Sequence, residues 1–217
     1  MPHEPRQRQS TNVLGALRAI VPDRDDITYA EALRIAELQA NKLLNLSRLT
    51  EAPVPSEVIT TLPKVRIEFI KSVASGASFW DTQRRTWVIH LSRSDSRCRC
   101  RFTLAHEFKH IIDHGSRHML YRGSRKTSAE TQAERVADYF AGCLLVPRRL
   151  LTRAWHNGVH KTCDLAKLFC VSEQAISVRL RQTRLVHRTP CPPVADAVRT
   201  SEQDQSSDPP SSEGAAS

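Results

Sequence analysis

The sequence contains no run of apolar residues that approaches the about 18 needed for a membrane-spanning helix. The first ten residues, Met1–Ser10, are polar and lack the apolar stretch of a secretory signal. The six cysteines form no disulfide ladder, and Cys98 and Cys100 are too close in sequence for a zinc knuckle. We therefore expect a cytoplasmic protein with reduced thiols and no membrane partner.

Charge is unevenly distributed along the 217 residues, which carry a net charge of +9 and are 40% apolar. This apolar content is enough for a single core. Residues 82–126 hold eleven Lys or Arg and three Asp or Glu, whereas the segment from Ser201 onward holds four acids and no base. A basic surface can attract nucleic acid or an acidic partner, but in an Arg-rich chain a solvated surface is the favoured interpretation.

One motif, His106-Glu107-Phe108-Lys109-His110, is the most informative feature of the chain. Residues four apart share a helix face, so His106 and His110 can reach one metal ion. A catalytic zinc site needs two such imidazoles, one further protein ligand and an open position for water, and manganese also accepts this kind of set. Glu107 would then act as the general base on water. Flanking apolar residues predict a half-buried helix that ends near Gly115.

A second predicted helix follows a capping-box pattern at 127–130 and carries carboxylates at helical spacing. Glu134 and Asp138 share a face, and Glu134 could complete the set of protein ligands. Asp138 would accept a hydrogen bond from the far ring nitrogen of a ligand His and fix its tautomer. Glu130 is an alternative ligand on spacing alone, and we expect it to be a capping residue instead. A solvated acidic face is the alternative interpretation of the pair.

These two segments together resemble a known family. Residues 101–110 read Arg-Phe-Thr-Leu-Ala-His-Glu-Phe-Lys-His, and residues 134–147 follow Glu-x-x-Ala-Asp-x-Phe-Ala-x-x-Leu-Leu-x-Pro. Both are similar to the paired motifs of the ImmA/IrrE metallo-endopeptidases, and the resemblance extends roughly over residues 28–185.

The resemblance implies a zincin-like peptidase with one zinc ion per chain. It implies His106, His110 and Glu134 as ligands and Glu107 as the catalytic acid/base. It also implies a protein substrate, because members of the family commonly cleave a helix-turn-helix repressor and so switch on stress-response or mobile-element genes.

Three positions depart from the family pattern. Asp138 stands where Asn is usual and should keep the hydrogen bond to the ligand His. Val146 replaces the usual Met, with little expected effect. Lys109 stands where many members have Gly, and we expect it on the outer face of the helix, where it would be harmless.

Apolar periodicity predicts an α+β fold that is mostly helical, with a small sheet of about three strands. Strands are expected at 65–70, 78–81 and 86–92, the last two as a hairpin. In zincin-like peptidases a strand beside the motif helix receives the substrate as an added strand, since a free edge offers unpaired amides and carbonyls. His90 is a candidate to line this cleft, and Tyr121, Tyr139 and His90 are candidates to stabilise the oxyanion.

Composition and periodicity divide the chain into four parts. We expect a flexible leader at 1–25 that contains a short helix near 13–20, a zinc metallopeptidase core at 26–150, a helical unit at 151–188, and a disordered tail at 189–217.

The segment Leu165–Leu180 resembles a helix-turn-helix, with Ser172 as the N-cap of its second helix. Arg179, Arg181 and Arg184 are expected to decorate that helix, which favours DNA contact on a first interpretation. Two short helices cannot form a core alone, however, so we predict that the unit packs on the peptidase core without reading DNA sequence.

The predicted function is zinc-dependent cleavage of a protein substrate. One alternative is a DNA-binding regulator with a structural zinc site, and another is a protein-binding adaptor that does not cleave. Glu107 argues against a structural site, because such a site needs no base.

Overall fold

The computed structural model describes residues 12–71 and 76–185, which lie within one folded unit, Met1–His187. The tail predicted at 189–217 lies outside the described residues, as does the start of the predicted leader. In chain order the elements are α1 (Val13–Arg18), α2 (Tyr29–Leu46), α3 (Glu57–Thr60), β1 (Val65–Ile70), β2 (Gly76–Asp81), β3 (Thr86–Ser92), α4 (Arg97–Asp113), α5 (Arg117–Leu120), α6 (Ala129–Leu145), α7 (Arg148–His156), α8 (Thr162–Phe169) and α9 (Glu173–Thr183).

The three strands form one mixed sheet in the order β1-β3-β2, with β1 parallel and β2 antiparallel to β3. The central strand β3 places Trp87, Ile89 and Leu91 on one buried face, as the two-residue period of a strand requires. The predicted hairpin is confirmed, although β2 begins at Gly76, earlier than expected.

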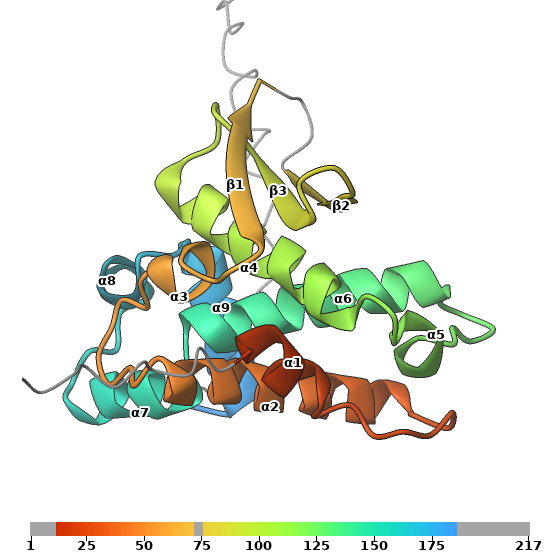
Figure 1. The fold of residues 1–217 in the computed structure, drawn as a ribbon. Coiled ribbons are helices and arrows are strands. Elements are labelled where there is room, and N and C mark those ends of the chain that lie inside the picture. Colours follow the sequence, from red (N-terminus) through yellow and green to blue (C-terminus); the bar gives the residue numbers. More distant parts are fainter. Residues whose placement is uncertain (1–11, 72–75, 186–217) are drawn as a thin grey trace, which may run out of the picture. The chain divides into compact units, whose positions relative to one another are not determined.

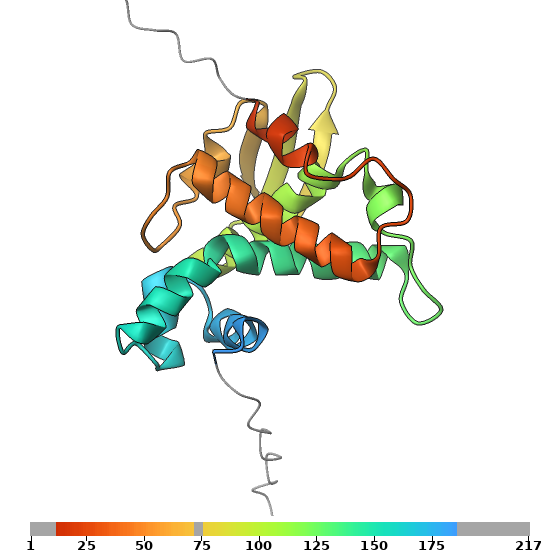
Figure 2. The ribbon, with the colours of Figure 1, turned by 90° about the horizontal axis from the view of Figure 1, so that it is seen from below.

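Helix α4 packs on one face of the sheet, and α6 and α2 follow in turn beyond α4 (Figure 1). The view from below shows α2 crossing α6 (Figure 2). The α+β class, mostly helical with a three-stranded sheet, is therefore confirmed. No helix among the described residues is both long and apolar enough to cross a membrane.

Helix α2 begins at a capping box. The Thr28 side chain accepts a hydrogen bond from the Glu31 amide, and the Glu31 carboxylate accepts one from the Thr28 amide, which completes a capping box. An apolar stripe from Ala32 to Leu44 is buried and supplies the contact with α6.

Helix α1 shows that the described part of the predicted leader, within 1–25, is not loose. Leu17 is fully buried in the core. The Arg18 guanidinium donates hydrogen bonds to the carbonyls of Ile111 and Ile112, at 2.8 and 3.2 Å. These carbonyls belong to the last turn of α4, where no helical amide is available to them. The expected short helix is confirmed, and its Arg18 caps the C-terminal end of α4.

The C-terminal helices pack on the end of α6. Ser172 caps α9 by accepting a hydrogen bond from the Ala175 amide, as predicted. The turn between α8 and α9 passes through Cys170 in the left-handed conformation. The apolar residues of this segment are buried: Leu165, Phe169, Val171, Ile176 and Leu180.

Arg179 is buried, with 2% of its surface exposed, so the expectation that it decorates the outside of α9 is wrong. Its Nε donates to the carbonyl of Val146 at 3.3 Å, and its guanidinium lies 5.7 Å from the centroid of the Tyr139 ring. Gly142 makes room for it, since a Cβ at that position would lie 3.1 Å from the Arg179 Cδ. Arg179 thus joins α9 to the end of α6, while Arg181 is exposed.

Candidate metal centre

Two packed helices, α4 and α6, carry the candidate site. The Ser96 side chain caps α4, and the Ser128 side chain caps α6 by accepting from the Thr131 amide. The capping role expected for Glu130 is therefore wrong. Buried apolar side chains on both helices, including Phe108 of α4 and Phe140 of α6 at a ring distance of 6.5 Å, hold the pair together.

The structure brings the predicted ligand atoms to one point. The Nε2 atoms of His106 and His110 lie 3.1 Å apart. The Glu134 carboxylate lies 3.1 Å from the first of these nitrogens and 3.2 Å from the second. These three residues form the one group of His, Cys, Asp and Glu side chains with metal-ligand spacing among the described residues. Their convergence requires α4 and α6 to pack with these faces together.

Asp138 orients one of the imidazoles. Its Oδ1 lies 2.9 Å from Nδ1 of His106, so the neutral ring carries its proton on Nδ1 and donates it to the carboxylate. Nε2 of His106 then presents a lone pair towards Glu134, an anion. Three electron-pair donors this close repel one another unless a proton or a metal cation lies between them.

The donor spacing matches a small divalent cation. Tetrahedral ligands at roughly 2.0–2.1 Å from zinc lie about 3.3 Å from one another, close to the distances above. The two imidazole side chains are 15% and 16% exposed and the Glu134 side chain 49%, so the cluster is open on one side. His106, His110 and Glu134 therefore fit a metal with room for a further ligand, and their assignment as ligands stays a prediction.

The pKa values of the two imidazoles are shifted in opposite directions. Burial together with the neighbouring His106 lowers the pKa of His110 to about 4, which keeps that ring neutral and its lone pair available. Burial also disfavours the charged form of His106, but the hydrogen bond to Asp138 and the nearby carboxylates outweigh it and raise the pKa of His106.

Glu107 lies beside the cluster without belonging to it. Burial raises the pKa of Glu107, which suits a group that must accept and return a proton near neutral pH. The Ser78 hydroxyl of β2 donates to its Oε2 at 2.7 Å. Gly76 also approaches it closely, since a Cβ there would lie 3.2 Å from Glu107 and 2.3 Å from a methyl group of Thr103. Edge strand β2 thus passes directly over Glu107.

The contacts of Ser78 and Gly76 with Glu107 were not predicted from the sequence. A serine and a glycine in a short strand carry no distinguishing local pattern, and they meet Glu107 through packing across the sheet. The one available signal was their two-residue spacing, which places both on the same strand face.

Lys109 does not lie on an outer face, as was expected, but is fully buried. Its ammonium pairs with Asp113, one turn later, and the Tyr121 hydroxyl donates to the same carboxylate. The prediction that Lys109 is harmlessly exposed is wrong, because the sheet, α6 and α1 all pack around α4.

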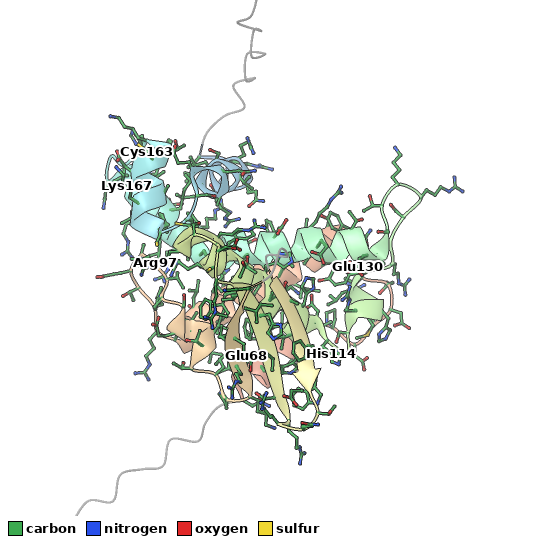
Figure 3. All side chains as sticks on the ribbon, turned by 90° about the horizontal axis from the view of Figure 1, so that it is seen from above. Glu68, Arg97, His114, Glu130, Cys163 and Lys167 are labelled. Atoms are coloured by element: carbon green, nitrogen blue, oxygen red, sulfur yellow. The ribbon has the colours of Figure 1, made fainter. Side chains whose placement is uncertain are left out.

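Other candidate residues lie away from the cluster. His90 lies on the face of β3 that is turned away from Ile89 and α4. Its Nε2 lies 3.4 Å from the Glu68 carboxylate, and its ring contacts the Phe79 ring. The expectation that His90 lines the cleft is therefore wrong. Glu130 lies on α6 (Figure 3), and its carboxylate pairs with Arg117 at 2.7 Å.

The two tyrosine candidates for oxyanion stabilisation have partners of their own. Tyr121 is bonded to Asp113, and the Tyr139 hydroxyl donates to Glu37 at 3.2 Å. That role is therefore unassigned among the described residues.

The fold is similar to that of a structure titled "Mycobacterium tuberculosis transcriptional regulator", with a TM-score of 0.54 and 15% identity. The match covers 77% of this chain and 51% of that one, so this chain spans about half the length of that protein. At this identity the likeness concerns the fold alone. No curated protein sequence matches this chain.

A family model covers the part of the chain that carries both motif helices. It is described as the IrrE N-terminal-like domain, Peptidase_M78, and it matches residues 63–181, more than half of the chain. The match includes all four residues of the candidate centre and Asp138 beside it. The chain therefore belongs to the Peptidase_M78 family of IrrE N-terminal-like domains.

Proposed function

We propose that this chain is a zinc-dependent metallo-endopeptidase with His106, His110 and Glu134 as metal ligands and Glu107 as catalytic acid/base. One observation carries the proposal. Two imidazole nitrogens and a carboxylate lie 3.1–3.2 Å from one another, beside a half-buried carboxylate that is not a ligand, in a chain of a peptidase family. A ligand set of two His and one Glu favours zinc, and manganese is an alternative.

A bound divalent cation supplies Lewis-acid activation of a water molecule and of the scissile carbonyl. Glu107 takes the proton that the attacking water loses and passes it to the leaving amine. Its raised pKa supports the second of these roles, because it favours the protonated form. Ser78 holds one oxygen of Glu107, and Asp138 holds His106 in the tautomer whose Nε2 faces the ligand cluster.

For the substrate we propose a protein, specifically a helix-turn-helix transcriptional repressor whose cleavage derepresses stress-response or mobile-element genes. The family resemblance is the basis for this part. The fold similarity to a protein titled as a transcriptional regulator is compatible with it.

Burial of Arg179 argues against α9 as a reader of DNA. A recognition helix must present its long side chains to base edges. Arg179 instead bonds Val146 inside the protein.

The metal assignment is tested by metal analysis of purified variants. We expect one zinc per chain in the parent and a loss of stoichiometric zinc in His106→Ala and Glu134→Ala, because each removes one of three protein ligands. Glu130→Ala is the matched control, since its carboxylate lies one turn from Glu134 but pairs with Arg117. Full zinc occupancy in Glu134→Ala would reject the assignment.

The chemistry is tested with Glu107→Gln, which keeps the size of the side chain and its contact with Ser78. We expect unchanged folding and zinc content but a loss of cleavage by a factor of at least about 10². The assay is electrophoresis and mass spectrometry of the helix-turn-helix repressor encoded nearest to this chain's gene. Undiminished cleavage by the variant would contradict the mechanism, whereas no cleavage by the parent would favour the non-cleaving adaptor.

A further inference from the structure

The outer edge of β2 is free of a partner strand. Within residues 12–71 and 76–185, β2 pairs with β3 alone and lies at one end of the sheet order. The face of β2 that carries Gly76 and Ser78 is the face that touches Glu107. A peptide paired with this edge would therefore pass beside the proposed base.

Trp80 lies on that same face, two residues beyond Ser78. Two residues of a strand advance about 7 Å, so the Trp80 side chain lies about that far along β2 from Ser78, which contacts Glu107. In the sheet register Trp80 is opposite Trp87, as Ser78 is opposite Ile89. The partners Trp87 and Ile89 face α4, which confirms the orientation of Trp80.

The Trp80 ring is exposed yet held in place. It is 39% exposed. Its ring makes an edge contact with Trp87 at 5.3 Å, and Trp87 makes a similar contact with His114 at 4.8 Å. His114 follows the last residue of α4, beside the sheet (Figure 3). An aromatic ring fixed in this way offers apolar surface with little further loss of side-chain entropy on binding.

We propose that Trp80 is a specificity-determining residue that binds a large aliphatic or aromatic side chain of the substrate. The proposal rests on the proposed peptidase function. Directly opposed residues of neighbouring strands point to the same face, with Cβ atoms about 4.5–5.5 Å apart. The substrate residue opposite Trp80 therefore lays its side chain on the indole, within about two residues of the cleaved bond.

Phe79 provides a matched control on the same strand. It is 43% exposed, similar to Trp80, but the pleat turns it to the opposite face, where it contacts His90. Loss of Phe79 removes a comparable exposed aromatic ring without touching the face beside Glu107.

The experiment uses the full zinc-loaded chain and a pool of proteome-derived peptides, with cut sites read by mass spectrometry. Glu107→Gln defines the background. We expect cut sites of the parent to be enriched in large apolar residues at one position within about two residues of the cleaved bond. Peptide pairs that differ by Leu or Phe against Ala at that position then give kcat/KM for each variant.

Trp80→Ala should lower kcat/KM by roughly tenfold or more for the Leu and Phe peptides and leave the Ala peptides unchanged, since a pocket contact of this size is worth such a factor. Trp80→Phe should restore most of the preference, and Phe79→Ala should keep it. An unchanged preference in Trp80→Ala, or an equal fall for all peptides, would overturn the subsite while the peptidase function stands. A parent no more active than Glu107→Gln overturns the peptidase function and the subsite with it.

Discussion

Lys109 illustrates how a single buried charge constrains the motif helix. It lies in the motif between Glu107 and the candidate ligand His110, yet its side chain is fully buried and its partner Asp113 is 1% exposed. Burial lowers the pKa of Lys109, and the Asp113 carboxylate opposes that shift. Tyr121 completes the group by donating to Asp113. These three residues tie the helix that carries the metal ligands to the segment that follows it.

Lys109→Ala should lower the free energy of unfolding by about 3–5 kcal/mol, because it leaves the Asp113 carboxylate buried without its counter-charge. Urea denaturation followed by tryptophan fluorescence measures the loss. The control is Lys167→Ala in α8. The Lys167 side chain is 80% exposed, and its ammonium lies 3.7 Å from Asp164 of the same helix. An exposed pair of this kind should change stability by less than about 0.5 kcal/mol. Equal effects of the two substitutions would show that burial of Lys109 is not what matters.

At the scale of elements, α9 is attached to the end of α6 through one arginine as well as through apolar contacts. Arg179 reaches across to the carbonyl of Val146 and the Tyr139 ring, and its Nη1 donates to Gln182 at 2.7 Å. Gly142 in α6 leaves the space that this side chain fills. Helix α9 therefore packs against the end of α6 and covers it.

Arg179→Ala should destabilise the protein by about 2–3 kcal/mol, since it removes a hydrogen bond from a charged donor and leaves a cavity beside Tyr139. Thermal unfolding at fixed metal content gives the shift. Arg181→Ala, two residues away on the exposed side, should stay within about 0.5 kcal/mol of the parent. A neutral result for Arg179→Ala would mean that apolar contacts alone attach the helix.

At the scale of the whole molecule, helices from both ends of the described chain support the pair α4 and α6. Arg18 of α1 satisfies the last carbonyls of α4, and the C-terminal helices cover the end of α6. The boundary expected between a core at 26–150 and a helical unit at 151–188 stays a prediction, although both segments share one hydrophobic cluster.

Deletion of all residues after 160 should destabilise the entire folded unit, because it removes the apolar residues of α8 and α9 from the shared hydrophobic cluster and exposes the end of α6. The expected signs are a large fall in the unfolding midpoint and a loss of bound zinc. A chain ended at His187, where the folded unit ends, should unfold at the parent's midpoint. If the shorter chain instead unfolds like the parent, the C-terminal helices are an independent appendage.

Sequence alone determined much of this protein. The His-Glu-x-x-His spacing, the carboxylates four residues apart and the surrounding family pattern identified the helices, the candidate ligands and the family, because helical periodicity and ligand chemistry are local properties. The strands and the cap at Ser172 were likewise predicted from local patterns.

Tertiary structure alone decided which faces are buried and which distant residues meet. Lys109 and Arg179 were expected to be exposed because charged residues usually are, but α4 and α9 are covered on those faces by elements far away in sequence. The contacts of Ser78 with Glu107 and of Trp80 with Trp87 depend on how the sheet lies on α4, so no local pattern contains them. Burial and long-range contact arise from the packing of elements, whereas a sequence pattern specifies each element by itself.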